Sequence, residues 1–237
     1  MRRLSGFFVE VFERIIPDPY IFAVLLTLIT AILAFIFAPK HAAVDILSAW
    51  YQGVAGKSNI FEFALQMILI LVTGYALANS APVRRLLERV ASIPRTPKRA
   101  VTLTFLISAI ACWLNWGFGL VVAGLVSREI ARRMRIDFGW LVAAAYSGFL
   151  IWASGLSSSI ALAQATPGNK LNIVEQLAHR VLPLHATIFT SYNLVPVIVL
   201  LIVLPLVFSA MQPAESDVVT GNVDALATDE PAPNVIA

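Results

Sequence analysis

A long apolar segment with a break at its centre constrains this chain more than any other feature. The segment runs for 28 residues from Ala100 to Ser127 and is interrupted by Asn115–Gly119. As one straight helix it would measure about 42 Å, whereas the hydrocarbon core of a bilayer is only about 30 Å thick. We therefore predict a re-entrant hairpin over residues 100–127, made of two half-length helices that fold back at the break.

Basic residues flank this segment on both sides, six between residues 80 and 99 and four between residues 128 and 137. Lys and Arg gather in the cytoplasmic loops of membrane proteins. With a cytoplasmic N-terminus, a re-entrant segment places 13 basic residues inside and 4 outside, whereas a crossing segment places 11 inside and 6 outside. The distribution favours re-entry, and an ordinary span followed by a misplaced basic loop is the alternative.

The composition indicates an integral membrane protein. Hydrophobic residues make up 59% of the 237 positions, charged residues make up 13%, and the mean hydropathy is +0.81. So few polar side chains cannot cover a soluble globule of this size. The net charge of +3 comes from short loops beside apolar spans, so it reflects membrane orientation and not nucleic-acid binding. The single cysteine, Cys112, excludes an intrachain disulfide and is expected to pack as a small hydrophobe.

The remaining apolar segments predict an all-α polytopic membrane protein with about four transmembrane spans besides the hairpin. The spans are expected at about 20–38, 61–79, 138–165 and 188–210, within a membrane domain of residues 20–210. Span 138–165 is also too long for one straight crossing, and its interruption at Ala153–Ser159 predicts a broken span. Residues 1–19 are expected to form an interfacial helix. Residues 211–237 are expected to be a disordered cytoplasmic tail or an inter-repeat linker.

The two interrupted segments are the strongest pointer to a binding site. Discontinuous helices place half-helix termini and unpaired backbone groups inside the bilayer, where they can hold an anion or a cation. The candidate substrate-binding residues are Asn115, Gly117 and Gly119 at the first break, and Gly155, Ser157, Ser158 and Ser159 at the second. In the alternative interpretation, the glycines pack helices closely and the serines bond back to their own helix.

No motif indicates an enzyme or a resident metal. The run Gly155-Leu156-Ser157 begins like the nucleophile elbow of a serine hydrolase, but Ser159 stands where that motif requires glycine. His179 and His185 fall in a predicted outer loop, where histidines are far more often bystanders than ligands, and we assign them no metal. We expect no cofactor and no nucleic-acid partner.

Five short motifs carry a resemblance to a known family: Ile16-Pro17-Asp18-Pro19, Asn79-Ser80-Ala81-Pro82-Val83, residues 115–122, residues 128–133 and Ala165-Thr166-Pro167-Gly168-Asn169. Together they resemble the short-chain fatty acid transporter family, and the similarity covers about residues 10–226. The resemblance implies uptake of small monocarboxylates such as acetoacetate or butyrate across the bacterial inner membrane. We also expect uptake to be ion-coupled, as in a symporter, with either a proton or sodium as the coupling ion. More distantly, a hairpin followed by a broken span is similar to one repeat of transporters built from two inverted repeats.

The chain departs from that family in length. Family members are about twice as long, so the chain would correspond to their N-terminal half only, and its end resembles the linker between their halves. A missing C-terminal repeat or a second copy would then have to complete the site at the middle of the membrane. The alternative is a truncated or split-gene membrane subunit that does not transport alone.

Overall fold

The structure is a computed structural model, and it describes residues 18–38, 43–56, 60–169 and 172–221. Within these ranges the regular elements are all helices, as predicted for an all-α membrane protein. Nearly all of the predicted interfacial helix, and the predicted tail beyond residue 221, lie outside the described residues. The chain divides into two units, residues 1–67 and 68–237.

The first unit contains α2 (Pro19–Phe37), α3 (Ala43–Ala55) and the first part of α4 (Ile60–Ala78). At the start of α2, Asp18 Oδ1 accepts a hydrogen bond of 2.8 Å from the Tyr20 backbone N–H. Pro19 occupies the first turn, where a helix makes no use of the missing N–H. α3 lies between the first two predicted spans, where we expected no helix, and its apolar residues recur at helical spacing.

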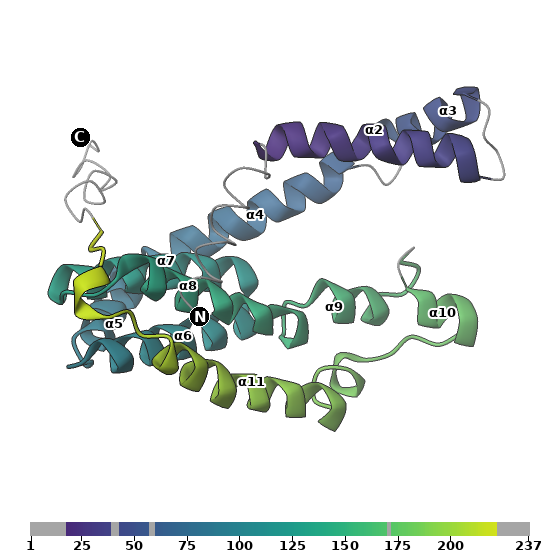
Figure 1. The fold of residues 1–237 in the computed structure, drawn as a ribbon. Coiled ribbons are helices and arrows are strands. Elements are labelled where there is room, and N and C mark those ends of the chain that lie inside the picture. Colours follow the sequence, from purple (N-terminus) through teal and green to yellow (C-terminus); the bar gives the residue numbers. More distant parts are fainter. Residues whose placement is uncertain (1–17, 39–42, 57–59, 170–171, 222–237) are drawn as a thin grey trace, which may run out of the picture. The chain divides into compact units, whose positions relative to one another are not determined.

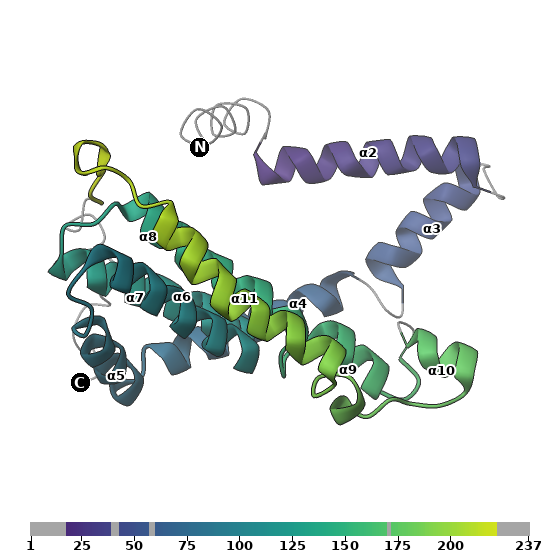
Figure 2. The ribbon, with the colours of Figure 1, turned by 60° about the horizontal axis from the view of Figure 1, so that its bottom comes forward.

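The second unit is built around α6, which packs against α7, α8, η1 and α11 (Figure 1). After the end of α4, its elements are α5 (Ala81–Ala91), α6 (Pro97–Leu114), α7 (Trp116–Arg133), α8 (Phe138–Ser147), η1 (Gly148–Ser154), α9 (Ser159–Ala165), α10 (Ile173–Ala178), η2 (Leu184–Ala186), α11 (Ser191–Ala210) and η3 (Glu215–Asp217). Phe105, Ile130, Leu141 and Ile151 are completely or almost completely buried in its core. α5 and the C-terminal end of α11 lie at one end of this unit, with α9 and α10 at the other (Figures 1 and 2).

Residues 100–127 fall within a helical hairpin, in which α6 and α7 pack against each other and meet at Asn115. Each arm has 18 residues and is about 27 Å long, which exceeds the half-length helices that we expected. The arms are longer because helix formation continues into the basic flanks. Thr96 caps α6 by accepting from the Arg99 backbone N–H, and α7 runs on to Arg133.

Residues 138–165 form an interrupted helix, with its break close to the predicted position. The α-helix ends at Ser147 and tightens into the 3-10 helix η1, which the sequence did not predict. Residues 155–158 leave the helix, and Ser158 then begins α9. The last predicted span, 188–210, corresponds to α11 and contains Pro196 and Pro205.

Four stretches of the described residues are long and apolar enough to cross a membrane: Pro19–Phe37, Pro97–Leu114, Phe138–Ala165 and Ser191–Ala210. A fifth candidate combines Ala64–Ala78 with Ala81–Ala91, two helices that meet at a bend of 69°. The predicted span 61–79 therefore corresponds to α4, and the basic helix α5 turns sharply away from its end. These helices make the chain a multi-pass membrane protein.

The first residues of segment 211–237, for which we predicted a disordered cytoplasmic tail or an inter-repeat linker, contact the start of α8. Val219 O accepts from the Phe138 backbone N–H at 3.0 Å, and Val219 N donates to Asp137 Oδ2 at 3.0 Å. Asp137 Oδ1 also accepts from Trp140 N at 2.8 Å and so caps α8. This contact could not be predicted from local sequence signals, because it joins residues 82 positions apart.

Candidate functional site

The hairpin tip is formed by Asn115, which ends α6 and begins α7. Its backbone is extended, with φ −154° and ψ 121°, so the chain reverses without a left-handed residue. Its N–H donates to Ala111 O at 2.9 Å, and its carbonyl accepts from Gly119 N at 2.8 Å. Its side-chain Oδ1 accepts from Phe118 N at 2.9 Å. Asn115 therefore satisfies backbone groups at both helix ends, which is the usual role of a cap.

The broken span meets the hairpin at this tip. Leu156 N donates to Trp113 O at 2.7 Å, and Trp116 N donates to Ser157 Oγ at 2.9 Å. We call this contact between residues 113–116 and 155–158 the tip–break junction. Both breaks predicted from the sequence are thus brought together, although they lie about 40 residues apart.

The glycines at the breaks are in close contact with other segments of protein backbone. A Cβ on Gly155 would overlap the Trp113 carbonyl, and a Cβ on Gly119 would overlap Cys112. A Cβ on Gly117 would lie only 2.9 Å from the Ile70 side chain. This is the close packing that the alternative interpretation predicts.

The three serines of the second break have different surroundings. Ser157 is half-buried and bonds to the hairpin tip rather than to its own helix. Ser158 is fully buried, and its Oγ accepts from Ala161 N at 3.3 Å, so it caps α9. Ser159 is exposed on the first turn of α9. The serines therefore divide between a cross-segment contact, a helix cap and a surface position.

The Asn115 side chain retains a donor that the protein does not use. Within the described part of the chain its Nδ2 group donates no hydrogen bond, and the one hydrogen bond of this side chain is accepted by Oδ1 from Phe118 N. The residue is half-buried. An amide N–H in this position can donate to a carboxylate oxygen.

Two further features of the junction were not predicted from the sequence. Asn193, on the first turn of α11, donates through Nδ2 to Ser154 O at 3.1 Å and to Ile188 O at 2.8 Å. The amide side chain at the start of an apolar span could have been noticed in the sequence. Its partner, 39 residues away, could not have been predicted. Asn193 thereby ties α11 to the end of η1.

The second feature is a row of aromatic rings beside the junction. Phe149 stacks on Tyr146 and on Trp152 with centroid separations of 6.0 and 5.7 Å, and Trp116 meets Phe149 edge-on at 6.4 Å. Residues three apart are aligned in a 3-10 helix. The unpredicted tightening into η1 therefore places Phe149 and Trp152 on the same side.

The described residues contain no group of three or more His, Cys, Asp or Glu side chains placed to hold a metal. Cys112 is buried in α6, with its sulfur 4.0 Å from Ser108 Oγ. Its packed position confirms the interpretation of this residue as a small hydrophobe.

Comparison with known proteins adds a family relationship. A sequence model of the family described as "Short chain fatty acid transporter" matches residues 1–234. The chain is 42% identical over 219 residues to a protein of Escherichia coli (strain K12) that is named, provisionally, a short-chain fatty acid transporter, and the match covers 92% of this chain and 48% of that protein. A Haemophilus influenzae protein with the same provisional name is 39% identical over 219 residues, with 91% and 48% covered.

The chain therefore spans about half the length of the curated relatives it matches. No solved structure matches it significantly.

Proposed function

The chain belongs to the short chain fatty acid transporter family, and from this premise we propose that it forms one half of an uptake pathway for short-chain monocarboxylates. The family is one of transporters and not of enzymes. The several apolar helices of the chain and the strong basic bias of its loops suit a protein of a bacterial inner membrane. The observation that carries the proposal is the tip–break junction, with its unused Asn115 amide donor.

α6 as a whole is long enough to cross a membrane, but Lys98 and Arg99 occupy its first turn, so the support for a re-entrant hairpin comes from the lengths of the apolar parts of the two arms. The apolar part of α7, from Trp116 to Ser127, has 12 residues and reaches about 18 Å from the basic end. The apolar part of α6, from Ala100 to Leu114, has 15 residues and reaches about 22 Å. Both distances exceed half of the roughly 30 Å hydrocarbon core but fall short of the whole. The tip then lies within the bilayer, beyond its midplane.

The length of the broken span agrees with the depth proposed for the hairpin tip. Its break is hydrogen-bonded to the hairpin tip, and the seven residues of α9 add about 10 Å beyond it. The span thus crosses the remaining hydrocarbon with its second half. Irregular backbone at this depth is tolerated where it is buried in protein or lines a cavity, and transport sites at breaks of membrane helices have this setting.

The substrate carboxylate would accept a hydrogen bond from Asn115 Nδ2 near the positive N-terminal pole of α7. Its short alkyl chain would lie against the aromatic rings of Trp116, Phe149 and Trp152. In this proposal the glycines support the site by allowing the two breaks to meet, and Ser157 holds them together.

Uptake would be coupled to a proton or a sodium gradient. The buried polar side chains of the described residues are hydroxyl and amide groups, with no carboxylate among them, and backbone carbonyls at the breaks are suitable ligands for sodium. A second copy or a C-terminal repeat would supply the opposing half of the site. The half-length match favours, as the second candidate, a subunit that transports only together with that other half.

The test is uptake of labelled butyrate by proteoliposomes containing the chain, alone and together with the C-terminal half of one of its relatives. Imposed proton and sodium gradients separate the two couplings. We expect gradient-driven accumulation that acetoacetate inhibits and butanol does not. Uptake that occurs only when the C-terminal half is present would identify the chain as a subunit that transports only together with that half. No accumulation in either preparation, from folded protein, would contradict the proposal.

A further inference from the structure

A lateral pocket of about 440 Å³ lies between α4, α5, α7 and α8 in the second unit, apart from the tip–break junction. Its walls are mainly apolar and include Val142 and Tyr146, which are 39% and 63% exposed. Arg84 from α5 and Arg128 from α7 line it as well. The pocket therefore combines an apolar surface that is open to the side with two guanidinium groups.

A glycine in the wall of this pocket faces open space. Gly124 lies in the interior of α7, and a Cβ built on it would meet no atom within 4 Å. Glycine weakens a helix relative to alanine, and the packing of this chain does not require it here. In contrast, the space beside Gly119, five residues earlier in α7, is filled by Cys112. The described residues leave the space beside Gly124 empty.

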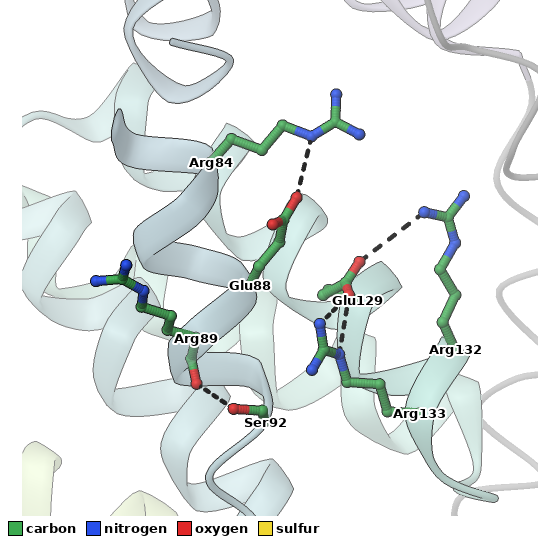
Figure 3. Close-up of polar contacts among 7 residues, drawn as sticks. All are labelled: Arg84, Glu88, Arg89, Ser92, Glu129, Arg132 and Arg133. Carbon is green, nitrogen blue, oxygen red and sulfur yellow. Dashed lines mark hydrogen bonds and ion pairs between the residues drawn. The ribbon is translucent and has the colours of Figure 1, made fainter. Parts of the chain in front are cut away.

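The surrounding charge is positive. Residues 80–137 contain ten Lys and Arg and three Asp and Glu, a net charge of +7. Glu215 and Asp217 of η3, which precede the contact of Val219 with Phe138, reduce this to +5. Figure 3 shows how the acids are used: Glu129 pairs with Arg133 at 2.7 Å and with Arg132 at 3.9 Å, while Glu88 pairs with Arg84 at 3.4 Å. The side chains of Arg84 and Glu88 are both more than 40% exposed, and such exposed pairs contribute little to stability, so this pair is too weak to keep Arg84 from binding an anion.

We propose that this pocket binds an anionic phospholipid of the cytoplasmic leaflet. The phosphate lies at Arg84 and Arg128, and the beginning of one acyl chain runs over Gly124 and along Val142 and Tyr146. Basic pockets between membrane helices on the cytoplasmic side suit such headgroups, and the basic bias places this end of the unit on that side.

The size and opening of the pocket favour a lipid over the short-chain substrate. Its volume of about 440 Å³ corresponds to about fifteen water molecules in the liquid, which a four-carbon acid would leave mostly empty. The exposed Val142 and Tyr146 side chains open it toward the lipid-facing surface. The proposal is independent of whether the chain transports anything.

The test is native mass spectrometry of the full chain released from nanodiscs that contain equal amounts of phosphatidylglycerol and phosphatidylcholine. We expect one retained phosphatidylglycerol per chain. The double variant Arg84→Gln/Arg128→Gln should bind it on the order of thirtyfold more weakly, about fivefold for each basic residue. The matched double variant Arg95→Gln/Lys98→Gln, which removes the same charge outside the pocket, should retain it.

A second variant tests the pocket without changing any charge. Gly124→Leu places a side chain in the open space and should exclude the acyl chain, with retention lost and the circular dichroism spectrum unchanged. Equal retention by wild type, the Arg84/Arg128 variant and Gly124→Leu would overturn the proposal. Equal loss of phosphatidylglycerol from both charge variants would also overturn it, because it would show a general attraction of the lipid to basic residues. The proposal would also be overturned if the wild-type chain retained a second copy of itself and the Gly124→Leu variant released that copy, because the pocket would then bind protein.

Discussion

The backbone N–H of Trp116 donates a 2.9 Å hydrogen bond to the side-chain oxygen of Ser157, which lies 41 residues further along the chain. This bond joins the first turn of α7 to the break of the membrane span that follows it. Together with the bond from Leu156 N to Trp113 O, it fixes the two interruptions against each other. The two interruptions of the second unit are therefore hydrogen-bonded directly to each other.

Removing the Ser157 hydroxyl should loosen this junction. Ser157→Ala leaves Trp116 N without its acceptor, which we expect to cost about 1 kcal/mol and to lower the melting temperature by about 2–4 °C. Thermal unfolding in detergent, followed by circular dichroism, measures the change. Ser159→Ala is the matched control, because Ser159 is exposed, and an equal loss in that variant would count against a specific contact.

Adding one methyl group at Gly155 should be more damaging. Gly155 has φ −101°, which alanine adopts readily, so the effect comes from overlap with the Trp113 backbone. We expect Gly155→Ala to destabilise the protein by about 1–3 kcal/mol. In contrast, Gly124→Ala should be neutral or stabilising, since a Cβ there meets open space. Equal melting temperatures for the two variants would show that the close approach at Gly155 is not needed.

The depth of the hairpin tip can be measured directly. If the hairpin re-enters the membrane as proposed, a spin label on Leu114→Cys, in a Cys112→Ala background, should collide with oxygen more often than with a water-soluble nickel complex, because the tip would lie inside the hydrocarbon. Labels on Arg95→Cys and Arg135→Cys, which flank the two arms, should show the reverse. A label at position 114 that is as accessible to nickel as those two would show that the tip reaches water.

The hairpin and the broken span could be predicted from the sequence because both depend on local signals. Asn115 followed by two closely spaced glycines marks a helix break, and Gly155 with Ser157 and Ser158 marks another. The flanking arginines indicated which segments end at the same surface. These signals act over a few residues, so they are visible without the fold.

The partners of these residues could not be predicted. Which backbone meets Gly155, and which carbonyls accept from Asn193, depend on contacts between residues about 40 positions apart. The 3-10 geometry of η1 and the binding of Val219 to Asp137 also arise from packing between distant segments. The sequence consequently identified where the helices break but not what fills the breaks.

The most direct test of the account is butyrate uptake by Asn115→Ala compared with wild type and Ser159→Ala in matched proteoliposomes. Losing a hydrogen bond to a charged carboxylate should reduce uptake about tenfold to a hundredfold. Membrane insertion should remain intact, and Ser159→Ala should transport like wild type. Uptake by Asn115→Ala at the wild-type rate would contradict the assignment of the tip–break junction as the substrate site.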